Sequence, residues 1–442
     1  MNNKTNNWID NNLSYMIKDL QSLVRIKSVE NYATTTPSNI PAPFGLDVRA
    51  VEDTMIKIAK EHCKMNVWEY GGYYVVVDEG TDDESNKEML GIITHLDVVP
   101  EGDGWSEPPY AANIINGNTI VGRGTVDDKG PAIASLYALK AVKECGYKFK
   151  RKVRLIFGLN EETNMLDISK YIEREQIPDI SFTPDGYYPL GNSEFSICHV
   201  TISKKYNSNI IFNSGDAPNI VPATAEANVK NKNYKTLGIQ CHASKPWDGE
   251  NAAQKMISVL YNQKDTLEEE DTKVITILNK YLGDNYYGES FGLNFEDKTG
   301  KLTCNLGVVK WDHNGFQIIL DLRCPNAVKK EDVRNKLQEA FLECDAEISN
   351  FEFEQGYYLS PESEIVNKLM KVYQENTGDY DSKPLTMGGG TYAKSFPNSV
   401  SFGPEGIMDI CGCHVPNEYI TFDQLSFTCK MIADAIISLA CE

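Results

Sequence analysis

Apolar side chains recur every three or four residues in two stretches near the start of the chain, residues 13–24 and 51–59. This spacing predicts two amphipathic helices. A segment rich in Thr, Pro and Ala, roughly residues 33–43, is expected to form a loop between them. A further helix is predicted over residues 131–145, because Pro131 suits the first helical turn and Gly146 the position just past the end.

Three short apolar runs each end in polar side chains. The first run leads into His95, the second into the pair Glu161 and Glu162, and the third into Asp185. Strands that alternate with helices predict an α/β fold with a mixed, mostly parallel sheet flanked by helices. Ligands of such sheets bind beyond the carboxyl ends of the strands. All four side chains are therefore candidates for one functional site.

The pattern changes between residues 190 and 385. Residues 303–311 and 316–323 resemble two strands, and Asn314-Gly315 between them is a strong hairpin signal. Helices are predicted on either side of this hairpin, over 251–260 and 330–344. We expect a separate α+β domain inserted into the first domain.

The predicted organisation is therefore a catalytic domain made of residues 1–189 and 386–442, with an inserted lid domain over 190–385. The last helix is expected to start near Phe422, because Thr421 and Gln424 have the spacing of a capping box. A chain of 442 residues is long enough for two such domains.

Composition narrows the class of protein. A hydrophobic fraction of 41% and a charged fraction of 24% are typical of a globular protein. We find no apolar run that approaches the roughly 20 residues of a membrane span and no apolar signal core at the N-terminus, so we expect a cytoplasmic protein. Eleven cysteines without zinc-knuckle spacing indicate reduced thiols. The net charge of −20 argues against nucleic acid and anionic membranes as partners.

Several motifs carry candidate chemistry, and each also has an ordinary structural interpretation. On a strand, His95 and Asp97 point to the same side, and a metal-bound imidazole usually donates its other N–H to a carboxylate. The motif GRGTVDDKG places Asp127 and Asp128 before a helix N-terminus, where they could simply be solvated. It lacks the patterns of nucleotide-binding loops.

Adjacent carboxylates such as Glu161 and Glu162 repel one another when desolvated, and a nearby divalent cation removes that cost. The ordinary alternative is an exposed turn. Asp185 and His414 would each be unremarkable alone, but the whole set offers the imidazole and carboxylate ligands that zinc prefers in catalytic sites. Cys411 and Cys413 leave a thiolate site as an alternative. The remaining histidines, His62, His199 and His313, are assigned no chemistry.

The motifs together resemble the dinuclear metallopeptidases that include peptidase V, carnosinase, glutamate carboxypeptidase and the acetylornithine and succinyl-diaminopimelate deacylases. The resemblance rests on THLDVVPEGDGW, VGRGTVDDKGP, GLNEET, TPDGYYPL, CHASKPWDGENAA, DLRCP, MGGGTYAKSFP and CGCHVPNEY, in family order from residue 94 to residue 419. It is greatest to the peptidase V-like dipeptidases.

This resemblance implies two metal-binding pockets in one site. His95 and Asp185 are expected to bind one divalent ion and Glu162 and His414 the other. Asp127 is expected to bridge both ions through a cis peptide to Asp128. Zinc is the expected metal, with manganese or cobalt as alternatives, since their N/O ligands are similar.

The resemblance also implies the roles of the other residues. Asp97 would orient His95, Glu161 would act as the general base toward a metal-bridged hydroxide, and His242 would stabilise the oxyanion. Substrate-binding positions are implied for Asn219, Arg323, Gly388, Gly389, Gly390 and Thr391. The expected function is that of a metallo-dipeptidase acting on small peptides with a free carboxylate.

The large insert resembles the enlarged lid of peptidase V, so we expect a monomer. Two other functions stay open at this point: an N-acyl-amino-acid deacylase of the same family, and a non-catalytic binding protein on the same fold. The sequence leaves the side chains of the substrate undefined.

Overall fold

A computed structural model describes residues 3–81, 85–283, 286–410 and 412–441. The described chain forms two compact units. Unit 1 consists of residues 1–192, 359–385 and 391–442, and unit 2 of residues 193–358 and 386–390. The short strands β10 (Gly191–Glu194), β22 (Tyr357–Tyr358) and β23 (Leu385–Met387) lie where the chain passes from one unit to the other.

Unit 1 is built on a mixed sheet, with strands in the order β24-β9-β5-β8-β4-β3. The strands β24, β9, β5 and β8 run parallel to one another, and β4 and β3 are antiparallel additions at one edge. Their bounds are β3 Asn66–Tyr70, β4 Tyr74–Glu79, β5 Met89–His95, β8 Lys152–Gly158, β9 Ile180–Thr183 and β24 Ser399–Ser401. The predicted α/β class and mostly parallel sheet are confirmed.

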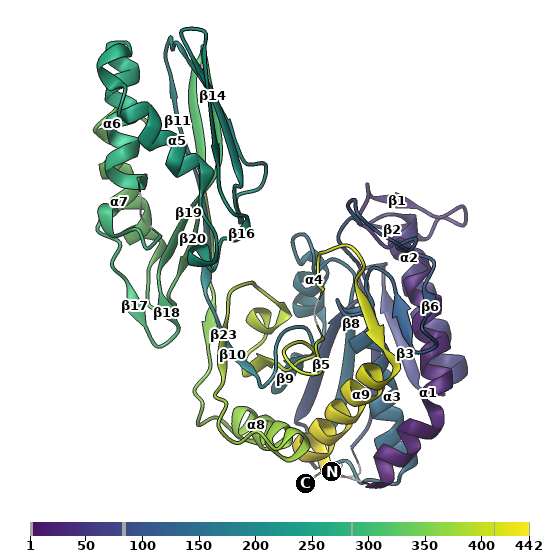
Figure 1. Ribbon diagram of the computed structural model, residues 1–442. Helices are drawn as coiled ribbons and strands as arrows, with labels where there is room; N and C mark the ends of the chain where they lie inside the picture. Colours follow the sequence, from purple (N-terminus) through teal and green to yellow (C-terminus); the bar gives the residue numbers. More distant parts are fainter. Residues whose placement is uncertain (1–2, 82–84, 284–285, 411, 442) are drawn as a thin grey trace. The chain divides into compact units, whose positions relative to one another are not determined.

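Alternating side chains of these strands bury both faces of the sheet. Val75 and Val77 of β4 face one hydrophobic core, while Tyr74 and Val76 face another. Helices covering unit 1 are α1 (Asn3–Val24), α2 (Leu46–Lys57) with its π-helical turn η1 (Ile58–His62), α3 (Lys129–Glu144), α4 (Leu166–Arg174), α8 (Glu364–Thr377) and α9 (Phe422–Ile436). In Figure 1, α3 and α9 lie side by side, and both pack against α1.

Helix α9 begins with the predicted capping box. The Thr421 N–H donates to Oε1 of Gln424 at 2.7 Å, and the Gln424 N–H donates to the Thr421 hydroxyl at 3.2 Å. With the π-helical turn η6 (Ile437–Cys441), this segment is long and apolar enough to cross a membrane by length and composition. The prediction that no apolar run approaches that length is therefore wrong. Since 72% of its most apolar window is buried against the rest of unit 1, it is a core helix.

Smaller elements complete unit 1. The predicted loop over residues 33–43 contains two short antiparallel strands of two residues each, β1 (Thr34–Thr35) and β2 (Pro41–Ala42). A three-stranded sheet, β25-β7-β6, joins the C-terminal segment to the segment before α3. Its strands are β6 (Asn113–Ile115), β7 (Thr119–Val121) and β25 (Tyr419–Thr421). This pairing places the chain around residue 418 beside residues 122–128.

Unit 2 is an antiparallel sheet with helices on one face, in the strand order β15-β14-β12-β19-β20-β11-β21. The strands are β11 (Ser196–Lys205), β12 (Ile210–Ser214), β14 (Thr224–Val229), β15 (Lys232–Leu237), β19 (Thr303–Asp312), β20 (Gly315–Cys324) and β21 (Glu347–Glu354). Helices α5 (Ala252–Tyr261), α6 (Glu269–Leu282) and α7 (Lys330–Leu342) contribute to its core. The predicted Asn-Gly hairpin is confirmed between β19 and β20.

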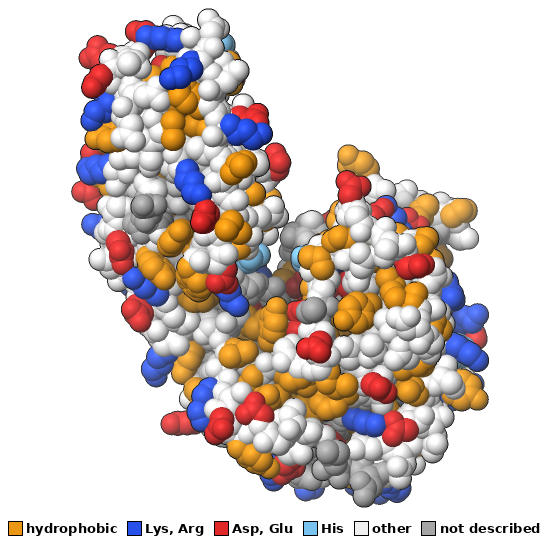
Figure 2. Space-filling view, viewed as in Figure 1, with side chains coloured by type: hydrophobic (Ala, Val, Ile, Leu, Met, Phe, Trp, Pro, Cys, Tyr) orange, Lys and Arg blue, Asp and Glu red, His pale blue; other side chains and the backbone are white. Residues whose placement is uncertain are grey.

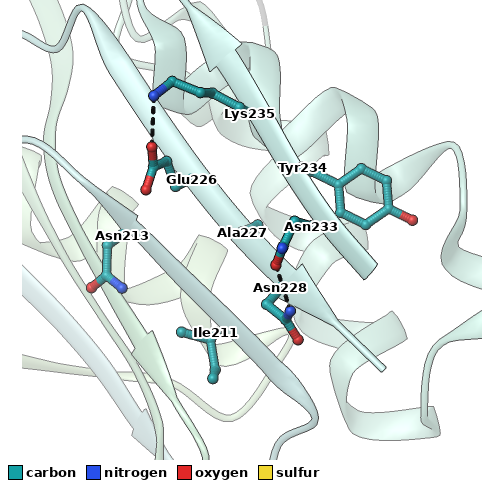
Figure 3. A pocket seen from close by; sticks show the side chains of 8 residues that line it. All are labelled: Ile211, Asn213, Glu226, Ala227, Asn228, Asn233, Tyr234 and Lys235. Atoms are coloured by element: carbon teal, nitrogen blue, oxygen red, sulfur yellow. Dashed lines mark hydrogen bonds and ion pairs between the residues drawn. The ribbon is translucent and has the colours of Figure 1, made fainter. Parts of the chain in front are cut away.

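Over β12, β14 and β15, the face of this sheet opposite the core is mostly polar. A hollow of about 410 Å³ lies over β12, β14 and β15 (Figure 3). The pairs Glu226–Lys235 (2.7 Å) and Asn228–Asn233 (2.6 Å) span it between directly opposed residues. These side chains satisfy one another, as on a solvated sheet surface. In Figure 2, acidic and basic side chains are interspersed over the visible surface of each unit.

Candidate metal centre

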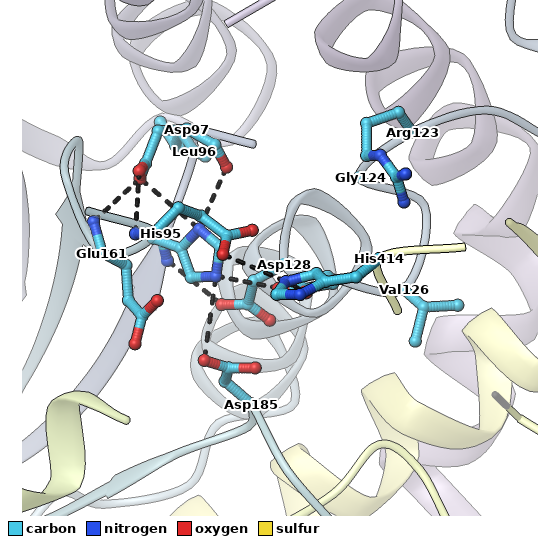
Figure 4. A network of polar contacts seen from close by, with 12 residues as sticks. His95, Leu96, Asp97, Arg123, Gly124, Val126, Asp128, Glu161, Asp185 and His414 are labelled. Atoms are coloured by element: carbon cyan, nitrogen blue, oxygen red, sulfur yellow. Dashed lines mark hydrogen bonds and ion pairs between the residues drawn. The ribbon is translucent and has the colours of Figure 1, made fainter. Parts of the chain in front are cut away.

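The polar side chains that follow three neighbouring parallel strands meet at one edge of the sheet. His95 is the last residue of β5, Glu161 and Glu162 follow β8, and Asp185 follows β9. Strand β5 lies between β8 and β9, so its carboxyl end is flanked by both of the others. Figure 4 shows Glu161, Asp185 and His414 arranged around His95 from separate elements.

Asp127 lies at the centre of this arrangement. It precedes α3, and its peptide bond to Asp128 is cis. Its Oδ1 lies 3.0 Å from Nε2 of His95, and its Oδ2 lies 3.0 Å from Nε2 of His414. The two oxygens of one carboxylate therefore face two different imidazoles.

Each imidazole also faces a second carboxylate. Oδ2 of Asp185 lies 3.7 Å from Nε2 of His95, and Oε2 of Glu162 lies 3.0 Å from Nε2 of His414. Donor atoms of His95, Asp127 and Glu162 lie within 4.8 Å of one another, as do those of His95, Glu161 and Asp185. These two groups share His95, and Asp127 lies between the two imidazoles, so the structure brings all five predicted ligand residues together.

Burial shapes the electrostatics of the acids. Desolvation, with the nearby charge of Asp127, raises the pKa of Asp185 to about 7. Desolvation also raises the pKa of Glu161 and of Glu162. Burial alone would raise the pKa of Asp127 too, but hydrogen bonds from His414 and His95 outweigh it and hold this pKa below its usual range. The acids therefore need positive charge nearby in order to be ionised together.

Burial acts on the imidazoles in the opposite sense, because it favours their neutral form and so lowers their pKa. Burial would lower the pKa of His95, but hydrogen bonds to Asp127 and Asp97 outweigh burial and raise it. Hydrogen bonds to Asp127 and Glu162 raise the pKa of His414 to about 11. Without metal, protons on these imidazoles provide the positive charge that the surrounding acids require.

The residues present fit a pair of divalent cations. Two imidazoles and three carboxylates are the N/O ligand types of catalytic zinc sites. Oε1 of Glu161 is buried and has no hydrogen-bond partner among the residues that the structure describes. A buried carboxylate oxygen without a partner is costly unless a cation, a water or a substrate group meets it.

Asp97 holds the glutamate loop and lies beside His95. Its Oδ1 accepts the N–H of Glu161 at 3.2 Å, and its Oδ2 accepts the N–H of Glu162 at 3.1 Å. The Nδ1 of His95 lies closest to the carbonyl oxygen of Asp97, at 3.0 Å, and 3.4 Å from its carboxylate. Asp97 thus contacts both His95 and the loop that carries the two glutamates.

Comparison with known proteins identifies the family to which this chain belongs. Residues 91–438 match the sequence profile of "Peptidase family M20/M25/M40". The chain belongs to this peptidase family. A relative from Bacillus subtilis (strain 168), described as "Putative dipeptidase YtjP", is 29% identical over 96% of this chain and 97% of that protein. The chain is accordingly an enzyme of a peptidase family, as predicted.

Solved structures share the fold. Human carnosine dipeptidase 1 has a TM-score of 0.60 and 14% identity, with 98% of each chain covered. The YXEP protein of Bacillus subtilis, described as a dinuclear metal binding peptidase of the M20 family, has a TM-score of 0.55 and 10% identity over 96% of this chain and 98% of that one. The predicted fold class and family are therefore confirmed.

Unit 2 of the peptidase carries other predicted residues. His242 lies at the end of β16 (Cys241–His242), which pairs with β13 (Ile220–Val221), and Asn219 precedes β13. The N–H of Ala243 donates to the carbonyl oxygen of Asn219 at 2.9 Å, so the two positions are neighbours. His242 is exposed, and its Nδ1 lies 2.7 Å from the hydroxyl of Ser244.

Arg323, on β20, is 3% exposed. Its Nε and Nη2 donate to the carboxylate of Asp321 at 2.8 and 2.7 Å, and its Nη1 donates to the carbonyl oxygen of Gly388 at 2.9 Å. A guanidinium has five N–H donors, so these three bonds leave two N–H groups without an acceptor among the residues that the structure describes. Gly388, Gly389 and Gly390 also belong to unit 2, whereas Thr391 belongs to unit 1 and accepts the N–H of Ala393.

The other histidines of the peptidase have structural partners. His62 lies 2.8 Å from Asp19, His199 lies 2.9 Å from Asp321, and His313 lies 3.0 Å from a backbone carbonyl oxygen. The thiolate alternative involves Cys411, which lies outside the described residues, and Cys413, whose pKa burial raises far above its usual range.

Sequence reasoning missed three side chains that hold this site together. Asp128 accepts the backbone N–H of His95 at 3.1 Å through its Oδ2. Arg123 and Glu418 form a buried ion pair at 2.8 Å beside the Asp127 turn. The only signal for them was their place next to motif residues, because such contacts join segments that are far apart in sequence.

Proposed function

We propose that this peptidase is a metal-dependent dipeptidase that hydrolyses the amide bond of small peptides with a free carboxylate. The observation that carries the proposal is the placement of the two Asp127 oxygens, each 3.0 Å from a different imidazole. The relative described as a dipeptidase and the fold of carnosine dipeptidase support the choice of substrate.

In this proposal His95 and Asp185 would hold one divalent cation, Glu162 and His414 would hold the other, and Asp127, placed between the two imidazoles, would serve both. Zinc is the proposed metal, with manganese or cobalt as substitutes. Such cations supply Lewis acidity, which lowers the pKa of water from about 15.7 toward about 7.

Glu161 is the proposed general base. One oxygen of its carboxylate takes a proton from the attacking water and later passes that proton to the leaving amine nitrogen. Burial raises the pKa of Glu161, which suits a group that must hold a proton between these two steps. Asp97 keeps Glu161 in place by accepting its backbone N–H.

Residues of unit 2 are proposed to recognise the substrate. His242 donates a hydrogen bond to the oxyanion that develops on the scissile carbonyl, an interaction typically worth ~10²–10³ in rate. The two remaining N–H groups of Arg323 bind the substrate carboxylate, together with Asn219. Gly388, Gly389 and Gly390 of unit 2 and Thr391 of unit 1 complete the proposed substrate-binding positions.

We propose a catalytic domain and an inserted lid as predicted, with residues 1–189 and 386–442 in the first and 190–385 in the second, working as a monomer in the cytoplasm. Within these predicted bounds, α8 packs in the core of unit 1 and residues 386–390 belong to unit 2. The lid takes the place of a partner subunit by supplying His242 from the same chain. Buried cysteines such as Cys63, Cys198 and Cys304 are free thiols, as suits a reducing compartment.

The test uses purified protein stripped with a chelator and supplemented with zinc, manganese or cobalt. A panel of dipeptides is assayed beside N-acetyl and N-succinyl amino acids and tripeptides. Metal-dependent turnover of dipeptides is expected. Turnover of the acylated amino acids alone would refute the dipeptidase proposal in favour of a deacylase, and no turnover with bound metal would favour a binding protein.

A further inference from the structure

Glu418 is a buried carboxylate that contacts the backbone of Asp127 in the candidate metal centre. It follows His414 by four residues, directly precedes β25, and is 0% exposed. It is not among the proposed metal ligands. A buried carboxylate is costly unless its oxygens are well supplied with hydrogen-bond donors, so its partners indicate why it is there.

The donors to Glu418 come almost entirely from the turn that carries Asp127. Backbone N–H groups of Gly124, Val126 and Asp127 donate to its carboxylate at 3.1, 2.8 and 3.2 Å. Nη1 of Arg123 adds a charged donor at 2.8 Å. Several backbone N–H groups of one turn directed at one anion bind it as a nest does, and here the anion is a side chain of the same protein.

The backbone of this turn is shaped around the carboxylate. Gly124 has φ +90°, a conformation that other residues rarely adopt. A Cβ at this position would also lie 2.9 Å from the side chain of Lys129. The glycine thus lets its own N–H and those of Val126 and Asp127 point toward one acceptor, while the N–H of Thr125 donates to the carbonyl oxygen of Gly122.

The same residue is tied to the segment of His414. The N–H of Gly122 donates to the carbonyl oxygen of Glu418 at 2.9 Å, which extends the pairing of β7 with β25. Only three residues separate Glu418 from His414. One residue therefore connects the turn of Asp127 with the loop of His414, whose side chains lie 3.0 Å apart.

We propose that Glu418 is a positioning residue that fixes Asp127 and His414 relative to each other, so that the pocket they share is formed before a cation binds. The proposal rests on the proposed metal roles of Asp127 and His414. Pairing of β7 with β25 alone would hold the two strands, but it supplies no bond to the N–H of Asp127. The carboxylate makes that bond.

The substitution Glu418→Gln tests this role with little change of shape. A glutamine keeps one acceptor oxygen and replaces the other by an amide NH₂, which meets donors of the nest and leaves them unpaired. The matched control is Glu52→Gln. Glu52 is also 0% exposed in unit 1 and is paired with an arginine, Arg49, at 3.1 Å, but it belongs to α2 and contacts neither loop.

Zinc affinity of the stripped proteins is measured by competition with a chromophoric chelator, and the cobalt-loaded proteins are compared by visible absorption. We expect Glu418→Gln to bind zinc about 10–100-fold more weakly, the usual effect of losing a residue that supports metal ligands. Its cobalt spectrum should change, because the ligand geometry changes. Glu52→Gln should keep the native affinity and spectrum even if its melting temperature falls.

Native affinity and spectrum in Glu418→Gln would overturn the proposal, as would an equal loss in Glu52→Gln. If circular dichroism shows Glu418→Gln to be unfolded, Arg123→Lys, which removes the planar donor but keeps the charge, is tested in the same way and is expected to weaken zinc binding. Unfolding of both variants would also overturn the proposal, because the pair would then support the whole unit. A native protein that binds no metal would instead refute the proposed function.

Discussion

The substitution Glu161→Gln separates the roles of the two adjacent glutamates. Glu161 and Glu162 both follow β8, and both have backbone N–H groups bound by Asp97. Oε2 of Glu162 lies 3.0 Å from Nε2 of His414, whereas Oε1 of Glu161 is buried without a partner among the described residues. The proposal makes Glu162 a ligand and Glu161 the base.

Glutamine has nearly the same shape as glutamate but cannot accept a proton at neutral pH. Loss of a positioned general base typically slows a reaction by ~10²–10⁴, which corresponds to ~3–5 kcal/mol in the barrier. We expect Glu161→Gln to lower kcat by that factor. KM should change little, because the contacts proposed for substrate binding come from other residues.

The assay combines steady-state kinetics on a dipeptide with metal analysis after gel filtration. Glu161→Gln should retain two metal ions per chain, and the matched variant Glu162→Gln should lose one. The donor atoms of Glu161 also lie within 4.8 Å of those of His95 and Asp185, so a ligand role for Glu161 is the direct rival. Loss of an ion from Glu161→Gln would establish that rival, and activity within tenfold of the native enzyme would refute the base assignment.

Three further predictions concern the same centre. Asp97→Asn should weaken zinc affinity about 10–100-fold by competition titration, because its amide would meet the N–H groups of the glutamate loop as a donor; native affinity would contradict this. Cys413→Ser should retain two metal ions by elemental analysis, and loss of one would restore the thiolate alternative. In the metal-free protein, the pKa of Asp185 is raised to about 7 by desolvation and Asp127, and that of His414 to about 11 by hydrogen bonds to Asp127 and Glu162. Both groups hold protons more tightly when folded, so their contribution to stability is present at low pH and is lost as the pH rises toward these values. The melting temperature of the stripped protein should therefore fall as the pH rises from about 4 through 7 and on toward 11, and an increase would contradict the reasoning.

Local patterns predicted the elements that carry the site. The apolar runs before His95, Glu161 and Asp185 are strands β5, β8 and β9, and their parallel order explains why those side chains meet. The Asn-Gly hairpin of unit 2 and the capping box of α9 were also predicted, because each depends on residues that are close in sequence.

Contacts between distant segments were not predicted from local patterns. Arg123 and Glu418 are 295 positions apart, and neither has a periodicity or motif that indicates a partner. The antiparallel strands β3 and β4 were missed at the edge of the sheet, as was the π-helical turn of η1. Such features depend on tertiary packing rather than on local preference.

The interrupted path of the chain through unit 1 has a consequence for biosynthesis. His95, Asp127, Glu162 and Asp185 all precede residue 193, but His414 and the core helix α9 come after the whole of unit 2. A chain growing at roughly 5–20 residues per second would expose the apolar surface of α3 for at least ten seconds before α9 can cover it. Nascent chains that stop before residue 414 would therefore be targets for chaperones and proteases, and they would lack one imidazole of the centre.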